Sequence, residues 1–456
     1  MDKQDKLFSV VILAAGNGTR MKSKLAKVLH ELNGSPLVAY SISLASSLDH
    51  QSIVTVIQPG QASLMPYQAS VSVEYAVQKE QLGTGHAVSC GLESINSCHD
   101  ILVLCGDMPL LRIGTLKRFL FAIGRGRSAV LTSTFSNPFG YGRIVRGSNG
   151  ELLKIIEEKD ADEEKKINEI NSGVMYLNAE MIQDTIGDIQ ANNSQNEHYL
   201  TDIIEIAIRK GHKFEAINIA DEDEVLGINS KKDLAVAESI IRKRHADLLL
   251  DQGVTLIDPS RIDIRGELKV GKDVTLDVGV IIEGSVELGD NVRVGAYTII
   301  KDSSIADNTQ ILSHSVIEGA VIASHCTVGP FARIRPGTKL EENVKVGNFV
   351  EVKKTSMGKG SKANHLSYLG DAEIGTGSNI GAGSITCNYD GKDKHKTVIG
   401  DNSFIGTNSS LVAPVKIGDG AFIAAGSVIT KNVPDHSLGL ARARQDNKTN
   451  WTKKKD

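Results

Sequence analysis

The sequence is poor in cysteine and in aromatic residues. Among its 456 residues there are five cysteines and one tryptophan, and aromatic residues make up only 4% of the chain. No two cysteines form a CxxC pair, and no histidines and cysteines cluster with the spacing of metal ligands. These absences argue against a disulfide framework and against a zinc site, so we expect reduced thiols. The cysteines are Cys90, Cys98, Cys105, Cys326 and Cys387.

The sequence also lacks a strong excess of one charge and any long apolar run. It has 51 basic and 55 acidic residues and a net charge of -4, which predicts no general affinity for nucleic acid. The first apolar run, from Phe8 to Ala15, stops at Gly16, so it is too short for a membrane span and wrongly flanked for a signal peptide. We therefore expect a cytoplasmic protein that has neither nucleic acid nor a membrane as its partner.

The second half of the sequence contains a repeat of six residues. A small aliphatic side chain recurs at every sixth position, with occasional steps of five. The repeat runs through Val270, Leu276, Ile282, Leu288, Val294, Ile300, Ile305, Ile311, Ile317, Ile322, Val328, Ile334, Leu340, Val346 and Val352, and it resumes at Ile399, Ile405, Leu411, Ile417, Ile423 and Ile429.

A period of six fits neither an α-helix nor a hairpin. It fits a solenoid in which each coil has three short strands, or about 18 residues, and each aliphatic side chain points inward. Glycine follows many of these aliphatics, as expected where a strand must turn a tight corner. Successive coils should stack roughly 4.8 Å apart, so residues eighteen positions apart become neighbours.

The first half is organised differently. Short apolar runs alternate with longer mixed segments, which is typical of a mostly parallel sheet covered by helices. Ligands of such sheets bind at the carboxyl ends of the strands. The runs are Phe8 to Ala14, Ser52 to Ile57, Ile101 to Cys105 and Ala129 to Thr132.

The length of the chain favours two or three domains. From Ser230 to Asp251 the apolar residues approximate helical spacing, and Gly253 follows as a stop signal. We therefore predict an α/β domain over residues 1–229, a linking helix over 230–252, and a β-helix with a C-terminal tail over 253–456.

A glycine loop follows the first apolar run, in the string LAAGNGTRM. Such a loop lets backbone N–H groups approach phosphate oxygens, and Arg20 and Lys27 could neutralise a triphosphate. The loop is neither a P-loop nor a complete dinucleotide fingerprint, so a nucleotide without a nicotinamide is favoured. An ordinary tight turn is the alternative.

Further polar residues follow the later strands. Asp107 in LCGDMP comes just after an apolar strand and could hold a magnesium ion, although it could also simply cap a turn. The strings EQLGTGH, GYGR and NSG, together with Glu157, could supply contacts to a base and a sugar.

The order of these motifs resembles a known family. LAAGNGTRM, QLGTGHA, GDMPL, GYGRI and EINSG in the first half, and GNFVEVKK, KANHLSYLGD, NIGAGSITCNYDG and LVAPV in the second, are similar to the bifunctional bacterial N-acetylglucosamine-1-phosphate uridylyltransferase/glucosamine-1-phosphate N-acetyltransferase. The resemblance covers nearly the whole chain. It implies a Rossmann-like nucleotidyltransferase domain, a left-handed parallel β-helix of hexapeptide repeats and a homotrimer. It also implies the last two steps to UDP-N-acetylglucosamine, a precursor of bacterial wall and outer-membrane polymers.

For the first half, the resemblance implies a uridylyl-transfer site. Sugar-phosphate oxygen would attack the α-phosphorus of UTP and expel pyrophosphate, with Arg20 and Lys27 as catalytic residues on the phosphates and magnesium held by Asp107 and Asn229. Asn229 is also among the substrate-binding residues. The others are Leu13, Ala14, Ala15, Gly16, Gln78, Gly83 and Thr84 for the uridine nucleotide, and Gly142, Glu157 and Asn171 for N-acetylglucosamine-1-phosphate.

The sequence departs from the family at three positions. Ala26 stands where proline usually precedes the lysine, Cys105 stands where an aromatic residue usually precedes Gly-Asp, and Asn364 replaces a smaller residue. These changes bear on loop stiffness, on substrate packing and on the orientation of the residue after Asn364.

In the repeat itself, two cations are eighteen positions apart. Arg335 follows Ile334 and Lys353 follows Val352, so we expect them to stack on adjacent coils about 5 Å apart. Like charges opposed on neighbouring strands repel, and an anion between them would reverse that cost. This predicts a phosphate site, with two side chains splayed into solvent as the alternative.

A histidine lies close to these cations. His365 comes two residues after Ala363 in the repeat and is expected beside Ala382 of the next coil, with Tyr368 and Asn379 nearby, which favours a general base over a structural histidine. The repeat is then interrupted by CNYDGKDKHK, which the solenoid must extrude as a loop, and such loops usually bind ligands.

For the second half, the resemblance implies acetyl transfer from acetyl-CoA to glucosamine-1-phosphate. His365 would remove the amine proton. Arg335, Lys353, Tyr368, Asn379 and Lys394 would hold the sugar phosphate, and Ala382, Asn388, Tyr389, Thr407, Ala425 and Arg442 would contact the coenzyme or the acceptor.

Two other functions remain open from the residues alone. One is a sugar nucleotidyltransferase whose solenoid only oligomerises, against which the stacked cations, His365 and the extruded loop argue. The other is a non-catalytic scaffold, which the complete set of nucleotide-loop motifs disfavours.

Overall fold

The computed structural model describes residues 8–62, 72–96, 98–219 and 221–453 and divides into two compact units, Met1–Ile241 and Arg242–Asp456. The charged N-terminal segment and the last three residues of the tail lie outside these ranges. The boundary between the units falls within helix α6 (Lys231–Asp251), which occupies the segment where a linking helix is predicted. None of the helices in the described ranges combines the length and the apolar character needed to cross a membrane.

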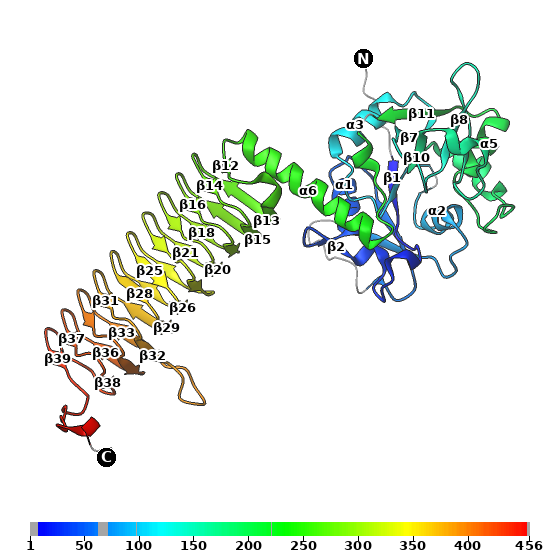
Figure 1. The fold of residues 1–456 in the computed structure, drawn as a ribbon. Helices are drawn as coiled ribbons and strands as arrows, with labels where there is room; N and C mark the ends of the chain where they lie inside the picture. The colour runs from blue at the N-terminus through cyan, green and yellow to red at the C-terminus, as the bar shows by residue number, and fades with distance from the viewer. Residues whose placement is uncertain (1–7, 63–71, 97, 220, 454–456) are drawn as a thin grey trace. The chain divides into compact units, whose positions relative to one another are not determined.

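The first unit is built on a nine-stranded sheet (Figure 1). Its main order is β11-β7-β10-β6-β1-β4-β5, and every neighbouring pair is parallel except the two that involve β10. The predicted mostly parallel sheet is therefore confirmed. The strands are β1 (Phe8–Leu13), β4 (Ile53–Ile57), β5 (Glu74–Val77), β6 (Asp100–Cys105), β7 (Ser128–Thr134), β8 (Arg143–Arg146), β9 (Leu152–Ile156), β10 (Glu169–Leu177) and β11 (Phe214–Ile219), with β2 (Glu31–Leu32) and β3 (Ser35–Pro36) forming a separate pair.

Helices cover both faces of this sheet. Successive strand residues point to opposite faces, so Ile12 packs with helices α1 and α3 while Val11 packs with α2, α4 and α5. The result is a three-layer α/β/α arrangement that leaves the carboxyl ends of the strands free for loops. The helices are α1 (Leu37–Ser46), α2 (Thr84–Leu92), α3 (Ile113–Ala122), α4 (Ala179–Thr185) and α5 (Asp202–Arg209), with short 3-10 helices η1 (Thr19–Met21), η2 (Lys27–Leu29), η4 (Glu163–Lys166), η5 (Ile186–Asp188) and η6 (Glu222–Val225).

The second unit is a parallel β-helix whose short strands stack as successive rungs (Figure 1). One side of each coil belongs to an 11-stranded sheet: β12 (Thr255–Leu256), β14 (Thr275–Leu276), β16 (Arg293–Val294), β19 (Gln310–Ile311), β22 (Thr327–Val328), β25 (Lys345–Asn348), β28 (Lys362–His365), β31 (Asn379–Ile380), β34 (Phe404–Ile405), β37 (Phe422–Ile423) and β39 (Leu438–Gly439).

The other two sides of each coil belong to a continuous 17-stranded sheet. Its strands are β13 (Asp263–Val270), β15 (Ile281–Leu288), β17 (Ile299–Lys301), β18 (Ser304–Ile305), β20 (Val316–Glu318), β21 (Val321–Ile322), β23 (Arg333–Ile334), β24 (Lys339–Leu340), β26 (Glu351–Lys353), β27 (Ser356–Met357), β29 (Tyr368–Gly370), β30 (Ala372–Ile374), β32 (Ile385–Cys387), β33 (Thr397–Ile399), β35 (Ser410–Val412), β36 (Val415–Ile417) and β38 (Val428–Ile429). Two further 3-10 helices, η7 (Pro259–Arg261) and η8 (Trp451–Lys453), lie at the two ends of the unit's sequence.

The aliphatic residues of the repeat form the core of this unit, as predicted. They belong to one buried cluster, with only Val270 partly buried. The cluster also shows that the repeat does not stop at Val352. Residues in equivalent inward positions fill the interval before Ile399, and they include Ala363, which the sequence already places in the repeat. The filling residues are Met357, Ala363, Leu369, Ile374 and Ile380.

Candidate active sites

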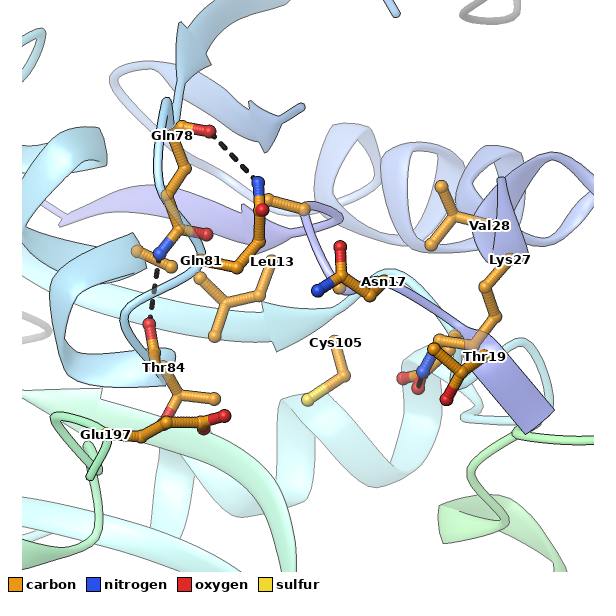
Figure 2. Close-up of a pocket in the computed structure, with 15 residues that line it drawn as sticks. Leu13, Asn17, Thr19, Lys27, Val28, Gln78, Gln81, Thr84, Cys105 and Glu197 are labelled. Atoms are coloured by element: carbon orange, nitrogen blue, oxygen red, sulfur yellow. Dashed lines mark hydrogen bonds and ion pairs between the residues drawn. The ribbon is translucent and has the colours of Figure 1, made fainter. Parts of the chain in front are cut away.

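A cavity of about 420 Å³ opens at the carboxyl ends of β1 and β6 in the first unit (Figure 2). It lies where ligands of parallel sheets bind, because the loops that leave the strands meet there. Several of the predicted site residues line it: Leu13, Ala15, Gly16, Lys27, Gln78, Gly83, Thr84 and Asp107.

The glycine loop after β1 is held in shape by contacts from both sides. Gln58 Nε2 donates to the carbonyl of Ala15 at 3.0 Å and to Asn17 Oδ1 at 3.1 Å. Gly18 has φ +57°, and a Cβ there would lie 2.6 Å from Lys27 Cβ. Glycine is thus required for two reasons, its left-handed backbone and the close approach of the lysine.

Lys27 joins two oxygens from distant parts of the chain. Its ammonium forms an ion pair with Asp107 and donates to Asn229 Oδ1 at 3.2 Å, and the side chains of Lys27 and Asp107 are largely buried. Two hard oxygens therefore converge on one cation, and magnesium prefers such a set of one or two protein oxygens. No group of three potential histidine, cysteine or carboxylate ligands occurs within the described ranges, which is compatible with such a sparse donor set.

Gln78, Gly83 and Thr84 form one wall of the cavity. Gln78 is buried, and its Nε2 donates to the carbonyl of Gly83 at 3.1 Å (Figure 2). A Cβ on Gly83, whose φ is +112°, would lie 2.5 Å from the carbonyl oxygen of His198. Thr84 Oγ1 accepts from the backbone N–H of Leu200 at 2.9 Å. This wall is therefore fixed against the segment that precedes α5.

Gly142, Glu157 and Asn171 come together on strands beside the cavity. The backbone N–H of Asn171 donates to the carbonyl of Gly142 at 2.9 Å, and a Cβ on Gly142 would lie 3.4 Å from Glu157 Oε2. Glu157 accepts from Thr201 Oγ1 at 3.0 Å, and burial raises the pKa of its carboxyl group. The three residues can thus present one amide and one carboxyl group to a polar ligand.

Cys105 connects this group to the cavity. A Cβ on Gly173, whose φ is +85°, would lie 2.7 Å from Cys105 Sγ, so the turn after Asn171 packs directly on the thiol. Burial, followed by the charge of Asp107, raises the pKa of Cys105 to about 12. The side chain is a neutral, apolar part of the lining.

In the second unit, the two predicted cations lie on adjacent coils. The backbone N–H of Arg335 donates to the carbonyl of Val352 at 2.8 Å, which brings Arg335 alongside Lys353. The charges are not simply opposed, however. Arg335 forms an ion pair with Glu351 at 2.7 Å, and that carboxylate raises the pKa of the guanidinium. The expectation of an uncompensated like-charge pair is therefore wrong. Glu351 lies two residues before Lys353 on β26, on the same outward face, and its carboxylate pairs with Arg335.

His365 is exposed at the end of β28 and contacts Asn348 of the preceding coil. The distance from His365 Nδ1 to Asn348 Oδ1 is 3.0 Å. An amide oxygen can only accept a hydrogen bond, so this contact places a proton on Nδ1, and in the neutral ring the lone pair is then on Nε2. That is the tautomer in which Nε2 can act as a base.

Tyr368 and Asn388 lie on the side of the coil that carries Lys353. Tyr368 pairs in register with Glu351, and its ring lies over Gly370, where any side chain would collide with it. Asn388 is buried, and its Nδ2 contacts Asp371 and, at 3.5 Å, Tyr368 Oη. Asn379 belongs to the other sheet, where it pairs in register with Phe404.

Ala382, Thr407 and Ala425 continue the position of His365 through the next three coils. The registers of β28, β31, β34 and β37 align these residues in one column, and Arg442 Nη1 donates to the carbonyl of Ala425 at 2.8 Å. At roughly 4.8 Å per coil, the column from His365 to Ala425 is about 14 Å long. The column is a line of small side chains after His365, and the guanidinium of Arg442 lies at its Ala425 end.

The interruption of the repeat forms a short hairpin, as predicted for an extruded loop. Tyr389 and Lys394 form an antiparallel bridge, and both side chains are exposed. Asp390 accepts from backbone N–H groups of the turn and contacts His395 Nε2 at 2.6 Å, and these bonds lower the pKa of Asp390 to about 2. The loop therefore has a fixed shape.

Comparison with known proteins agrees with this two-part geometry. The family described as MobA-like NTP transferase domain matches residues 10–168, the GMPPB C-terminal domain matches residues 264–356, and the bacterial transferase hexapeptide family matches residues 396–431. The chain is 47% identical over 445 residues to the bifunctional protein GlmU of Pseudoalteromonas atlantica, with 97% of this chain and 98% of the relative covered. It is 48% identical over 444 residues to the bifunctional protein GlmU of Acinetobacter baylyi, with the same coverage.

This chain belongs to the bifunctional GlmU family. Its expected fold class, with a nucleotidyltransferase domain of mostly parallel sheet and a hexapeptide-repeat β-helix, is confirmed by both the matches and the structure.

Some predicted residues of this GlmU-family chain do not line the cavity: Gly142, Glu157, Asn171 and Asn229 lie beside it, and Arg20 and Ala14 are also absent from its lining. Arg20 lies on η1 with an exposed side chain, and the side chain of Ala14 is buried in the core. Only the backbone of Ala14 can therefore face the cavity, and the Arg20 side chain points into solvent.

Other residues line the cavity without having been predicted. Gln81 lies within the string EQLGTGH that drew attention to Gln78, and Asn17 and Thr19 lie within the glycine loop, so a sequence signal existed for these. Glu197 comes from a polar loop without a motif, and only the packing of that loop on Gly83 reveals it. The residues are Asn17, Thr19, Val28, Gln81, Ala87 and Glu197. Cys105, which the sequence connects with substrate packing, also lines the cavity. Asn348 in the second unit was likewise not predicted, although the repeat places it one coil before His365.

Proposed function

We propose that this GlmU-family enzyme carries out its two reactions at the two sites described above. Acetyl transfer to glucosamine-1-phosphate is assigned to the β-helix, residues 253–456, and uridylyl transfer to N-acetylglucosamine-1-phosphate to residues 1–229, with 230–252 as the connecting helix. The convergence of Asp107 and Asn229 on Lys27, beside a glycine loop, is the observation that carries the uridylyl site.

Uridylyl transfer requires mainly positioning and charge neutralisation. Leu13, Ala14, Ala15 and Gly16 supply the loop, and Gln78, Gly83 and Thr84 hold the uridine nucleotide. Gly142, Glu157 and Asn171 hold the sugar, and Asn229 is also among the substrate-binding residues. An oxygen of the sugar phosphate attacks the α-phosphorus of UTP, the bond to the bridging oxygen breaks, and pyrophosphate leaves with its electron pair.

Arg20 and Lys27 face the phosphates during this step. Magnesium is assigned to Asp107 and Asn229, where it would neutralise phosphate charge when bound. With the metal held by these two oxygens, the Lys27 ammonium would be available to pair with phosphate instead.

In acetyl transfer, His365 is the general base. Its Nε2 takes a proton from the amino group of glucosamine-1-phosphate as the amine forms a bond to the thioester carbonyl carbon of acetyl-CoA. The C–S bond then breaks, and the departing thiolate takes the proton from His365 and leaves as a thiol. Arg335, Lys353, Tyr368, Asn379 and Lys394 are assigned to the sugar phosphate. Acetyl-CoA, the co-substrate, is assigned to the column formed by Ala382, Thr407, Ala425 and Arg442, with Asn388 and Tyr389 beside it. A straight column about 14 Å long with a guanidinium at its end suits an extended pantetheine arm that ends in phosphates.

A coupled assay tests whether each unit carries out one of the two reactions. With glucosamine-1-phosphate, acetyl-CoA and UTP supplied together, the wild-type chain should release both free thiol and pyrophosphate, and N-acetylglucosamine-1-phosphate should appear as an intermediate. Asp107→Ala should stop pyrophosphate release and leave thiol release near wild type. Loss of both activities in a folded variant would contradict two independent sites.

We also propose that the enzyme is a cytoplasmic homotrimer. Support for self-association comes from a row of stacked, half-exposed rings along one corner of the β-helix, where Tyr297, His314, Phe331 and Phe349 have centroids 5.3, 4.9 and 5.4 Å apart. Such a row of exposed rings is typical of a surface that another chain covers. The cytoplasm is where UTP and acetyl-CoA are supplied together.

Sedimentation velocity tests the trimer. The wild-type protein should sediment as a species with three times the monomer mass. Phe349→Asp should shift the distribution of sedimentation coefficients toward that of the monomer. Phe121→Asp, which changes a ring that is 90% exposed on the first unit, should not. A monomeric wild-type chain at micromolar concentration would contradict the proposal.

A further inference from the structure

The segment that joins the uridylyl-transfer cavity to helix α6 is held by hydrogen bonds on both sides. The backbone N–H of Ile228 donates to the carbonyl of Asp107 at 2.9 Å, so the segment begins in contact with the loop that carries the carboxylate. The next residue, Asn229, presents its Oδ1 to the Lys27 ammonium at 3.2 Å. The chain then enters α6 at Lys231. Asn229 therefore contacts a residue of the cavity with its side chain although it lies immediately before a helix.

Asp233, in the first turn of α6, accepts hydrogen bonds from the backbone N–H groups that precede the helix. Its Oδ2 accepts from the N–H of Asn229 at 3.0 Å and from the N–H of Ser230 at 2.8 Å. Ser230 Oγ in turn accepts from the N–H of Asp233 at 3.2 Å, which completes a reciprocal cap. A carboxylate in the first turn is also favoured by the helix dipole.

This cap determines what the Asn229 side chain is free to do. Asparagine just before a helix readily turns its side-chain oxygen onto the helix N–H groups and becomes the cap itself. Here Ser230 already caps the helix, and Asp233 already holds the N–H of Asn229. The Asn229 oxygen is therefore left to accept from Lys27, while its Nδ2 donates to the carbonyl of Gly227 at 3.3 Å.

We propose that Asp233 is a positioning residue of the uridylyl-transfer site, which fixes the backbone of Asn229 so that its side-chain oxygen remains directed at the Lys27 ammonium, with which Asp107 also pairs. The inference rests on the proposed function, because it assumes that Asp107 and Asn229 hold the metal. Asp233 acts only through Asn229. Residues that orient metal ligands commonly affect metal affinity by roughly 10- to 100-fold.

Manganese binding measures this role without turnover. The full-length chain is titrated with Mn²⁺ in the presence of UTP and with the sugar phosphate omitted, and free Mn²⁺ is followed by electron paramagnetic resonance. Asp233→Ala should raise the apparent Kd roughly 10-fold. Asp233→Glu should stay within about threefold of wild type, because glutamate at this position can reach back to the same N–H groups.

Ser230→Ala is the matched control. It removes the hydroxyl cap from the same helical turn but leaves both backbone bonds to Asp233 in place. It should lower the melting temperature while changing the Kd for Mn²⁺ less than twofold. The melting temperature of the first unit, measured on every variant, reports whether the unit that carries these residues is folded.

The possible outcomes separate the positioning role from the metal site itself. Wild-type Mn²⁺ affinity in Asp233→Ala, or equal weakening in Ser230→Ala, would overturn the role of Asp233. Asp107→Ala is titrated in the same way, and if its affinity were unchanged, the proposed metal site would fail as well. If Asp233→Ala does not fold, Asp233→Asn decides, since a neutral acceptor should give an intermediate Kd and a wild-type value would contradict the proposal.

Discussion

The two units bring their site residues together in opposite ways. In the β-helix, His365 and Asn348 are 17 positions apart and meet because they occupy equivalent places in neighbouring coils. In the α/β unit, Lys27 meets Asp107 across 80 positions and Asn229 across 202. The first kind of contact follows from a period, whereas the second requires that the strand order be known.

The difference should appear in how each unit tolerates change. A solenoid contacts only its neighbouring coils, so damage to one column should remain local. The α/β cavity is shared by several loops, so one shifted loop should disturb several functions together. The following predictions, from the largest effect to the smallest, test this contrast.

The largest effect is expected from His365→Ala. Acetyl transfer should fall about 10²- to 10⁴-fold, because the ammonium form of the amine must lose a proton before it attacks a thioester. Pyrophosphate release from UTP and supplied N-acetylglucosamine-1-phosphate should be unchanged. Thiol release and pyrophosphate release are measured in parallel. Unchanged acetylation would mean that His365 is a structural residue and not the general base.

A smaller but broader effect is expected from Gly18→Ala. The new Cβ would lie 2.6 Å from Lys27 Cβ, so the lysine must move away from Asp107 and Asn229. Such a displacement can cost up to about 10²-fold in kcat/KM for uridylyl transfer. Gly60→Ala is the control, since Gly60 also has a positive φ but open space around it. Equal effects of the two changes would point to backbone strain rather than to Lys27.

Lys353→Ala should act on one substrate only. Losing a hydrogen bond from a charged group to phosphate should raise KM for glucosamine-1-phosphate about 10-fold, while KM for acetyl-CoA stays the same. Lys359→Ala, which breaks an exposed ion pair with Glu342, should change neither constant. Parallel rises in both constants after Lys353→Ala would contradict the assignment of the phosphate to this coil.

The smallest effect concerns Glu157 and pH. Burial raises the pKa of this carboxyl group above its unfolded value, so its ionisation costs more in the folded chain, and the free energy of unfolding should fall as pH rises through that interval. Glu157→Gln removes this dependence. In urea unfolding, the change in the free energy of unfolding from pH 4 to pH 8 should therefore be more favourable for the variant than for wild type, by about 1 kcal/mol or less. An identical pH dependence in both proteins would mean that burial does not determine the ionisation of Glu157.

Much of the fold was predictable because each unit has a clear pattern. The predicted runs correspond to β1, β4, β6 and β7, since buried parallel strands are continuous apolar stretches. Strand β10 was not predicted, because its sequence EINSGVMYL contains an Asn-Ser-Gly string that is typical of a turn. In the structure this string forms an irregular register between Asn171 and Met175, within an antiparallel strand inserted between β6 and β7.

The candidate sites were predictable to different degrees. The column through His365 follows from the repeat, but the ion pair between Arg335 and Glu351 does not, because a period fixes strand register and not which neighbouring side chain is contacted. In the α/β unit, the motifs identified most of the lining of the cavity. Glu197 could not be found, because only the packing of its loop against Gly83 brings it there.

The sequence alone determined the inward aliphatic positions, the corners and the stacking of the β-helix, because there every contact lies about one coil away along the chain. Only the tertiary structure decided that Lys27 stands between Asp107 and Asn229, and that Asp233 frees Asn229 for this contact. The physical reason is that parallel strands meet at their carboxyl ends in an order that no local pattern encodes, so the loops that form the cavity become neighbours only when the sheet has assembled.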